Sequence, residues 1–503
     1  MHINLKAGLL FRSILLSLTV SVIIPFINPL YAQNVVEHSV VKIHCSQRRP
    51  DVFKPWSKMP SNEISGSGVV ISGNRILTNA HVVMYASQVY VQPYQSADKI
   101  SAEVIGIAPG IDLALLKLDD EDFFKQHPPL SMSDVIPKTG EKVNAYGYPM
   151  GGAGLSVTEG IVSRIEFSPY YYDTAGLRIQ VDAALNPGNS GGPVISNNKI
   201  VGIVFSGIRK ADNIGYLIPV EEVKLFLDDM ADGKYDGKPM MFDQLQTLEN
   251  DALREKLGLK KSQTGMMVNI PYVEDNKSSL KKWDIITSIG GQNIDNEGKI
   301  ITKGGLRLNF AYLIQHLQKN DKIDLEVIRN SKEINLEIPL FREKKALVPD
   351  LKDGYPSYFI YGPLVFSAAT NEFLMYLQRD WFSSLLRRSS PLITRLNDSA
   401  TAEQEQLIVI SSTMFSDKIT KGYGDPFSQV IKDINGIKIK NIRDLVKVIN
   451  NIKGPYIEIN FAGNYVETMI FRKDEMAAAT EDILSENGIR FQCSSDLMDL
   501  LKN

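Results

Sequence analysis

Short apolar runs rich in β-branched residues recur along residues 35 to 229, and Gly, Pro, Asn and Asp separate them. The clearest runs lie at 68–71, 88–92, 114–118, 142–146, 178–181 and 200–205. Many short strands at this spacing are typical of antiparallel barrels or a sandwich. The region ends in a predicted helix, whose apolar face carries Val220, Val223, Leu227 and Met230.

A second pattern appears after a polar segment at 233–239, which has no periodicity and predicts a linker. Apolar positions around a two-residue turn occur at 285–294 and again at 430–439, with matched positions 145 residues apart. Helical stretches at 309–317 and 442–449 follow the two copies. The second half is therefore a weak internal repeat, and we expect two small α+β modules there.

Each copy ends in an alternating hairpin. In the first copy the apolar positions 323, 325 and 327 are expected to face 334, 336 and 338. In the second copy 457, 459 and 461 are expected to face 466, 468 and 470.

The N-terminal 32 residues have the three parts of a signal peptide: a cationic start, an apolar core at 14–24, and a small residue at Ala32. Pro25 and Pro29 interrupt the apolar stretch well short of the roughly 20 residues that a membrane span needs. We therefore expect cleavage after Ala32 and an exported protein, periplasmic if the source is a Gram-negative bacterium.

Composition narrows the class of protein. The chain has 503 residues, 55 Lys+Arg, 58 Asp+Glu and 44% apolar residues, which is a globular composition with material for about three domains. The formal charge of −3 gives no basic surface that would predict a nucleic-acid partner. The two cysteines, Cys45 and Cys493, lie near opposite ends of the chain, and we expect them to be unpaired.

A candidate nucleophile lies in the sequence Asn-Pro-Gly-Asn-Ser-Gly-Gly-Pro at 186–193. A nucleophilic serine needs a tight turn and backbone N–H groups that converge on the oxyanion, and glycines permit the torsions that this requires. Ser190 fits that description. By itself the segment also fits a glycine-rich hairpin turn.

Two further residues complete a candidate constellation. His81 follows an apolar strand, at a loop edge where it can act as a general base, although a single histidine is more often structural. Asp112 opens the apolar strand 111–116, and a capping aspartate is its alternative reading. His81, Asp112 and Ser190 come in the order used by chymotrypsin-like double barrels, at separations of 31 and 78 positions. Together they predict a serine protease triad.

The segments around these residues resemble the Deg/HtrA family of serine proteases. They are Gly-Ser-Gly-Val-Val at 66–70, Thr-Asn-Ala-His-Val-Val at 78–83, Asp-Leu-Ala-Leu-Leu at 112–116, and Asp-Ala-Ala-Leu-Asn-Pro-Gly-Asn-Ser-Gly-Gly-Pro at 182–193. Further segments at 357–366, 405–410 and 479–484 resemble the plant-type Deg proteases, whose second PDZ domain is atypical. The resemblance covers essentially the whole mature chain.

The resemblance implies a mainly β fold with α+β modules, that is, a chymotrypsin-like double β-barrel protease domain followed by two PDZ-like domains. The expected division is a signal peptide at 1–32, a trypsin-like protease domain at 33–232, a linker at 233–245, a first PDZ domain at 246–345, a second, atypical PDZ domain at 346–475, and a C-terminal helical extension at 476–503.

The family's catalytic roles carry over to matching positions. The resemblance implies that His81 is the general base, that Asp112 orients its imidazole, and that Ser190 attacks the scissile carbonyl. The N–H groups of Gly188 and Ser190 would hold the oxyanion, with Asn189 lining the turn. In this family the peptide bond at the position of Gly188 is thought to flip between competent and incompetent states.

Substrate specificity is expected to be aliphatic. Six positions before the nucleophile, where trypsin-like enzymes carry an acid, this chain has Ala184, which Leu185 follows. With Ile214 and Tyr216 as the opposite wall, an apolar pocket would accept Val, Ala, Ile or Leu at P1, the residue before the scissile bond. Barrel packing is the alternative reading of Ala184 and Leu185. The substrate backbone is expected to add as a strand along Phe205, Ser206 and Gly207.

Peptide binding by the first PDZ module is expected on the strand that carries Met266, Met267 and Val268, with Leu257, Gly258 and Leu259 as the carboxylate loop. A strand buried in the core is the alternative. In the second module 407–411 would be the equivalent strand, and the long insertion between 366 and 405 leaves ligand binding there in doubt.

Two aromatic groups are candidates for assembly and signalling. Phe53 and Trp56 lie where family members use aromatic residues to form trimers, with barrel packing as the alternative. Tyr170, Tyr171 and Tyr172 lie in the stretch that resembles the family's sensor loop, with a solvent-facing cluster as the alternative.

The expected function is that of an exported, ATP-independent serine endopeptidase that degrades unfolded or damaged proteins, without a cofactor or a metal. Expected partners are unfolded polypeptides, C-terminal or internal peptides at the PDZ domains, and copies of the chain in trimers or multiples of trimers. The alternatives are a PDZ-based chaperone or binding protein with a silent protease domain, and a processing protease with one dedicated substrate.

Overall fold

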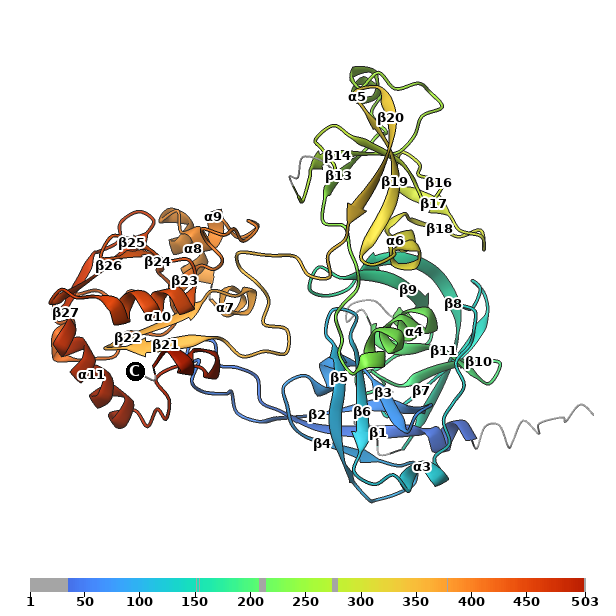
Figure 1. Ribbon diagram of the computed structural model, residues 1–503. Helices are drawn as coiled ribbons and strands as arrows, with labels where there is room; N and C mark the ends of the chain where they lie inside the picture. Colours follow the sequence, from blue (N-terminus) through green and yellow to red (C-terminus); the bar gives the residue numbers. More distant parts are fainter. Residues whose placement is uncertain are drawn as a thin grey trace, which may run out of the picture.

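A computed structural model describes residues 35–150, 152, 154–207, 214–273, 279–377 and 379–501. The predicted signal peptide lies outside these residues. The described chain forms a pair of β-barrels, a first module that stands on one end of them, and a second module at their side (Figure 1).

The first barrel is closed by six antiparallel strands in the order β1-β2-β3-β6-β5-β4. The strands are β1 (Val40–Gln47), β2 (Asn62–Ile71), β3 (Arg75–Thr78), β4 (Ala86–Gln92), β5 (Ile100–Ala108) and β6 (Leu113–Leu118). Two single-turn helices belong to its loops, α2 (Ala80–Val83) and α3 (Phe123–Gln126).

The second barrel is closed in the order β10-β11-β12-β9-β8-β7. Its strands are β7 (Lys142–Gly147), β8 (Ser156–Pro169), β9 (Ala175–Val181), β10 (Pro193–Ser196), β11 (Lys199–Gly207) and β12 (Gly215–Pro219). Helix α4 (Val220–Asp229) and a 3-10 turn, η1 (Met230–Asp232), follow. All six strand segments predicted from the sequence lie within observed strands, and the predicted helix is α4.

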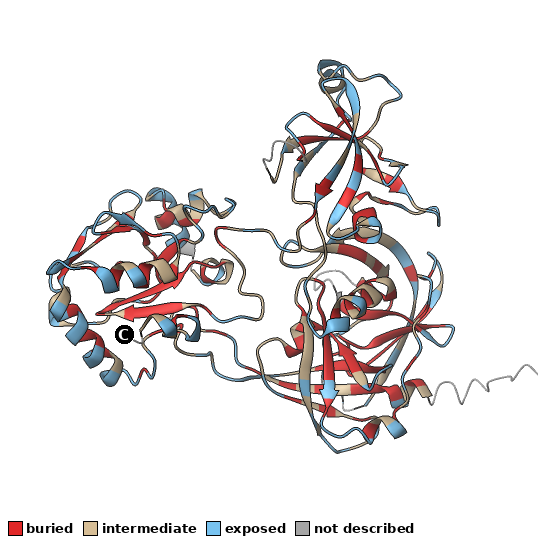
Figure 2. Ribbon diagram, viewed as in Figure 1, coloured by how far each residue is buried: buried red, intermediate tan, exposed pale blue. Residues whose placement is uncertain are grey.

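Strand alternation explains how the two barrels join. Because successive side chains of a strand point to opposite faces, β2 places Val70 inside the first barrel, and Val69 and Ile71 in the cluster between the barrels. A separate cluster, which includes Val143 and Val181, fills the second barrel. Long stretches of the barrel strands are therefore buried (Figure 2).

The first module is a sheet in the order β13-β14-β15-β19-β20. Its elements are β13 (Gln244–Thr247), α5 (Asp251–Lys256), β14 (Met266–Ile270), β15 (Ile285–Ile289), β16 (Gln292–Asn293), β17 (Lys299–Ile301), β18 (Arg307–Asn309), α6 (Ala311–Leu317), β19 (Lys322–Arg329) and β20 (Lys332–Pro339). The predicted hairpin register is confirmed, because Ile323, Leu325 and Val327 pair with Ile338, Leu336 and Ile334.

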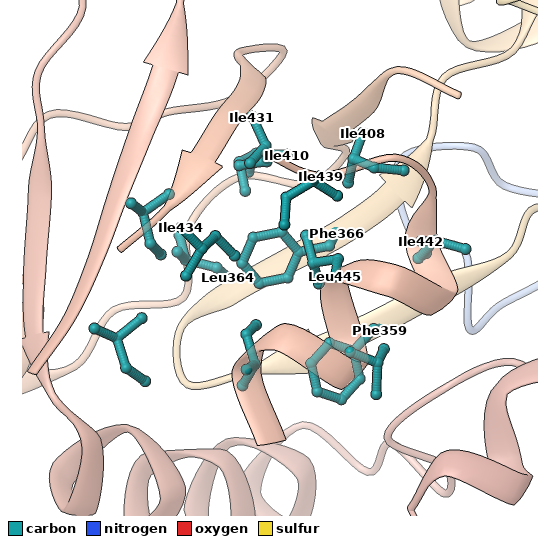
Figure 3. Close-up of a cluster of buried hydrophobic side chains, with 14 of the residues drawn as sticks. Phe359, Leu364, Phe366, Ile408, Ile410, Ile431, Ile434, Ile439, Ile442 and Leu445 are labelled. Carbon is teal, nitrogen blue, oxygen red and sulfur yellow. The ribbon is translucent and has the colours of Figure 1, made fainter. Parts of the chain in front are cut away.

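The second module has the sheet order β21-β22-β23-β24-β26-β27. Its strands are β21 (Tyr358–Tyr361), β22 (Leu364–Ala368), β23 (Ile408–Ile410), β24 (Val430–Ile434), β25 (Ile437–Lys438), β26 (Tyr456–Ala462) and β27 (Met469–Arg472). Its helices are α7 (Asn371–Tyr376), α8 (Arg379–Arg387), α9 (Pro391–Thr394), α10 (Ile442–Asn451) and α11 (Lys473–Glu486), with the 3-10 turns η2 (Lys418–Thr420) and η3 (Ser495–Leu500). Figure 3 shows its core, where Phe359, Phe366, Ile434 and Leu445 pack together.

The internal repeat is visible in the structure. Strand β24 begins 145 residues after β15, and β25 begins 145 residues after β16. Gly290 and Gly291 in one copy, and Asn435 and Gly436 in the other, take positive φ angles, which a tight hairpin turn of type I′ requires.

The second hairpin differs from its predicted register. Ile457 and Ile459 pair with Phe471 and Met469, and Ile470 is exposed. The expected partners 466, 468 and 470 were one residue out of register, and a slip of one residue turns every side chain to the other face. Met469 and Phe471 are the residues that the core takes instead.

Two expected domain limits also move. Residues Gln244 and Leu245, placed in the linker, pair with β14. Met476 of α11 and Leu497 of η3 are fully buried in the core of the second module, so residues 476–503 are not a separate extension.

Cys45 and Cys493 are buried free thiols, as predicted. Within the described ranges, no helix is long and apolar enough to span a membrane.

Candidate active site

Strand pairing in the first barrel brings His81 and Asp112 together. Strands β3 and β6 run antiparallel, with Thr78 opposite Ala114. His81 comes three residues after Thr78, and Asp112 comes two residues before Ala114, so both lie at the same edge of this strand pair. The edge faces the second barrel.

The carboxylate of Asp112 holds the histidine at two points. Its Oδ2 lies 2.7 Å from His81 Nδ1, and its Oδ1 accepts a 2.8 Å hydrogen bond from the His81 backbone N–H. Asp112 is 1% exposed, whereas the His81 side chain is 42% exposed. The imidazole is thus fixed through Nδ1 and leaves Nε2 to act.

Asn79 supports Asp112 from behind. Its Nδ2 donates a 2.9 Å hydrogen bond to the Asp112 carbonyl oxygen. Asp112 has a φ of 60°, an uncommon left-handed conformation for a residue other than glycine. A strained backbone held by its neighbours is typical of functional sites.

The charge of Asp112 changes the acid–base behaviour of His81. Partial burial of the ring acts to lower the pKa, but the charge of Asp112 and the hydrogen bond to it outweigh burial. The pKa of His81 therefore lies above its ordinary value.

Ser190 lies on a turn between β9 and β10, and the first barrel holds this turn in place. The Ser190 carbonyl oxygen accepts a 2.8 Å hydrogen bond from the Ser67 N–H. Ser67 Oγ donates to the Gly188 carbonyl and accepts from the Tyr148 N–H, both at 2.8 Å. One buried hydroxyl of β2 thus connects two loops of the second barrel.

The backbone of this turn requires glycine at position 188. Gly188 has a φ of 101°, and a Cβ there would collide with the Tyr148 carbonyl oxygen. The Pro187 carbonyl accepts a 2.7 Å hydrogen bond from the Met150 N–H. Because this peptide bond is trans, the Gly188 N–H points away from Met150.

The turn leaves two donors free. Of the described residues, none accepts a hydrogen bond from the N–H of Gly188 or of Ser190. The Asn189 N–H instead donates to the Asn186 carbonyl at 3.0 Å, so Asn189 lines the turn without supplying its N–H. The N–H groups of Gly188 and Ser190 are therefore free to donate to an oxyanion, which is stabilised by such converging donors.

The expected specificity residues lie on the segment after β9 and at the start of β12. Leu185 packs on the cluster inside this barrel and also covers Gly215, where a Cβ would collide with its side chain. Ala184 is exposed, and Ile214 and Tyr216 are half-buried. Leu185 therefore packs on the barrel core, as the packing alternative has it, and its part in a P1 pocket stays a prediction.

The segment expected to receive the substrate backbone has one free edge. Pairing of β10 with β11 ends at Ile203, and Val204 bonds to Gly191 and Gly192. Beyond this point β11 pairs with β12 alone among the described strands, with Ser206 opposite Tyr216 and Gly207 opposite Gly215.

The peptide strand expected in the first module is corrected by the sheet order. Strand β14, with Met266, Met267 and Val268, has β13 on one side and β15 on the other, so it offers no edge. Leu257 and Leu259, on either side of Gly258, pack into a small cluster against Met267. The end strands of this sheet, among the described residues, are β13 and β20, and β13 is the one beside β14.

The strand at 407–411 in the second module is corrected for the same reason, since β23 lies between β22 and β24. In the first module, β13 lies two strands away from β15, which precedes the repeated turn. The strand at the same distance from β24 in the second module is β22, and β21 pairs with its outer edge. The chain's own segment 492–494 then bonds to β21 through the Ile360 and Ser494 N–H groups.

Phe53 and Trp56 pack against other aromatic residues of the same chain. The Phe53 ring contacts Phe373 and Phe427, and Trp56 contacts Phe415, all in the second module. This packing corrects the barrel-packing reading, because the partners lie in the second module, and a role in trimer assembly stays a prediction.

The three tyrosines at 170–172 differ in exposure: Tyr170 is half-buried, whereas Tyr171 is 46% exposed. Tyr170 and Tyr171 pack on Phe205 with centroid distances of 5.1 and 5.7 Å. Arg178 lies over the Tyr170 ring at 4.6 Å. A sensor role remains a prediction.

Sequence reasoning missed Ser67. The Gly-Ser-Gly-Val-Val segment carried the resemblance, but no pattern shows that its serine reaches across the barrels. Glycines on both sides were the available signal: a Cβ at Gly66 would lie 3.3 Å from the Ser190 carbonyl oxygen.

Two family models, curated relatives and solved structures match this chain. Residues 66–203 match the trypsin-like peptidase domain, and residues 348–496 match the PDZ domain. Protease Do-like 2, chloroplastic, of Arabidopsis thaliana is 33% identical over 468 residues, which is 92% of this chain and 76% of that protein. Protease Do-like 4, mitochondrial, of the same plant is 35% identical over 418 residues, or 82% and 76%. The solved HtrA-type protease AlgW with tripeptide has a TM-score of 0.49 at 26% identity, covering 62% of this chain and 95% of that one.

The double barrel, the His–Asp pair and the matched domains define a trypsin-like serine endopeptidase with a C-terminal PDZ domain. The chain belongs to the Deg/HtrA family of serine proteases, with Do-like proteases as relatives along most of its length.

Proposed function

We propose that this endopeptidase is exported, works without ATP, and degrades unfolded or damaged polypeptides, with His81, Asp112 and Ser190 as its triad. The observation that carries the proposal is the imidazole held by Asp112, together with a serine turn that has two free N–H donors and whose Gly191 closely approaches Asn79, two residues before His81. An intact His–Asp pair argues against a silent protease domain.

The chemistry follows from these positions. Ser190 Oγ bonds to the scissile carbonyl carbon while its proton passes to His81 Nε2, and Asp112 stabilises the imidazolium. The N–H groups of Gly188 and Ser190 receive the negative charge on the carbonyl oxygen. The C–N bond then breaks, and His81 gives the proton to the leaving amine. Water hydrolyses the acyl-enzyme by the same steps in reverse.

The pocket beside Ser190 selects aliphatic P1 residues. Ala184, Leu185 and Ile214 supply no charge, and a buried unpaired Lys or Arg would meet a desolvation cost of several kcal/mol. The substrate backbone adds along Phe205 to Gly207, whose edge is open.

The remaining parts of the proposal concern location and partners. The signal-like residues 1–32 support export. Strand β13, as a free edge, is the place where the first module would add a C-terminal or internal peptide. Family resemblance supports trimers or multiples of trimers.

Digestion of casein by the full chain, with mass spectrometry of the products, tests the proposal. Without ATP, we expect Val, Ala, Ile or Leu at P1 in most cleavage sites. Ala184→Asp places an acid where trypsin-like enzymes carry one and should shift cleavage toward Lys and Arg. Casein that stays intact would contradict the proposed function. A preference of the wild-type chain for basic P1 residues would contradict the proposed pocket.

A further inference from the structure

A cavity of about 620 Å³ opens beside His81 and Asp112. Its walls come from two domains that are far apart in the sequence. Met84, Tyr171 and Tyr172 belong to the barrels, whereas Met375 and Tyr376 belong to α7 of the second module. The cavity therefore exists only while the second module is docked on the barrels.

The docking is specific and well packed. The loop between β1 and β2 reaches the second module (Figure 1), where Val52 is 3% exposed within an apolar cluster of that module. The Phe53 ring lies 5.6 Å from Phe373, which is itself on α7. The Tyr85 N–H, four residues after the histidine, donates to Asp353 Oδ1 at 2.6 Å. These contacts hold α7 at a fixed place relative to His81.

Apart from His81 and the charged groups, the cavity is lined by four tyrosines, two methionines, two prolines and one valine. Besides Asp112, two carboxylates line it, and both are already bonded within the module. Glu372 accepts from the Leu351 N–H at 2.9 Å, and Asp350 accepts from Asn371 at 2.9 Å. Arg49, at the same cavity, offsets part of their charge. What remains for a ligand is tyrosine rings, two prolines, Val52 and two methionines, of which Met375 is 83% exposed. Methionine side chains adapt readily to large apolar groups.

The position of the cavity identifies its occupant. A substrate strand along Phe205 places its P1 side chain in the pocket at Leu185. Because side chains of a strand alternate, the preceding residue, P2, points the other way, toward the first barrel and His81. Tyr171 connects the two places, since its ring packs on Phe205 and also lines the cavity.

We propose that this cavity is the P2 subsite, that it takes a large apolar side chain, aromatic ones best, and that α7 of the second module forms its outer wall. The inference rests on the proposed endopeptidase function. It makes the second module, whose own sheet edge is covered, a determinant of cleavage specificity.

The test uses the full chain and peptides that share Val at P1 and carry either Phe or Ala at P2. The ratio of the two kcat/KM values should favour Phe by about tenfold or more, as a filled apolar pocket does. Met375→Ser should lower this ratio at least about threefold, because it removes part of the apolar wall. Phe382→Ser is the matched control, since Phe382 is a 52% exposed side chain on α8 outside the cavity, and it should keep the wild-type ratio.

The outcomes separate the two proposals. A fluorophosphonate that does not label Ser190, with neither peptide cleaved, would overturn the proposed function. Cleavage with equal rates for Phe and Ala would overturn the subsite alone. Equal acceleration of both peptides by Met375→Ser would also overturn it, because α7 would then act as an obstruction. If Met375→Ser unfolds the module, Tyr376→Ala, which removes the neighbouring wall, must lower the ratio in its place.

Discussion

The two barrels contribute to the site in different ways. The first barrel fixes His81 and Asp112 on paired strands, with both carboxylate oxygens bonded to the histidine residue. The second barrel presents Ser190 on a turn whose shape depends on the left-handed backbone of Gly188 and on Ser67 from the first barrel. The position of the general base is therefore fixed within the first barrel. The shape of the oxyanion site depends on the contact between the two barrels.

This difference locates the adjustable part of the enzyme. A change in the contact between the barrels would disturb the Gly188 peptide before it disturbs the His–Asp pair. Ser67 is the buried side chain through which such a change would act, because it bonds to both Gly188 and Tyr148.

Removing the nucleophile should have the largest effect. Ser190→Ala should lower kcat on the order of a millionfold, because loss of a triad member removes covalent catalysis. Peptide hydrolysis measures this loss, and the elution volume of the variant should equal that of the wild type. Residual activity above a few per cent would show that Ser190 is not the nucleophile.

The second-largest loss of activity should follow a change of Asp112, the carboxylate that orients His81. Asp112→Asn should lower kcat about ten-thousandfold, because the amide misdirects the imidazole without deleting it. The rate is measured with the same peptide. A loss as severe as that of Ser190→Ala would mean that the variant has lost more than the tautomer of His81.

The oxyanion turn should be less sensitive than the triad. Gly188→Ala should lower kcat about 10²- to 10³-fold, the effect of one lost oxyanion donor. The φ of 101° and the crowding at Tyr148 force the alanine backbone to rearrange. Gly140→Ala is a matched control: its φ is also positive, at 83°, but a Cβ there meets nothing within 4 Å. Equal activity of the two variants would contradict the role of the Gly188 peptide.

The smallest effect is a shift in pH dependence. The pKa of His81 lies above its ordinary value, and the base must be neutral, so kcat/KM should fall as the pH drops through a value above about 6.5. Below that point each pH unit should cost about tenfold. In Asp112→Asn the carboxylate charge is gone, so the acid limb should move to lower pH. An acid limb that stays in place would show that Asp112 does not set the pKa of His81.

Much of this architecture could be predicted from local patterns. The repeated turns at Gly290 and Asn435 and the apolar alternation of Ile323, Leu325 and Val327 depend on neighbouring residues alone, and the structure has them as expected. The candidate triad could be predicted because the required residue types lie in short, specific segments.

The misassigned features depend on long-range contacts. Strand β13 reads as linker because Leu245 is its one apolar residue, and only its pairing with β14 makes it a strand. The cavity at His81 could not be predicted for the same reason. It joins Met375 to Met84 across nearly 300 positions, and no periodicity carries that information.

Labelling with a fluorophosphonate, followed by peptide mapping of the adduct, tests the central claim most directly. We predict that the wild-type chain carries one adduct, on Ser190, and that Ser190→Ala carries none. His81→Ala should react far more slowly, because the serine then lacks its base. A folded wild-type chain that cleaves casein while the adduct lies on another residue, or forms at the same rate without His81, would contradict the account.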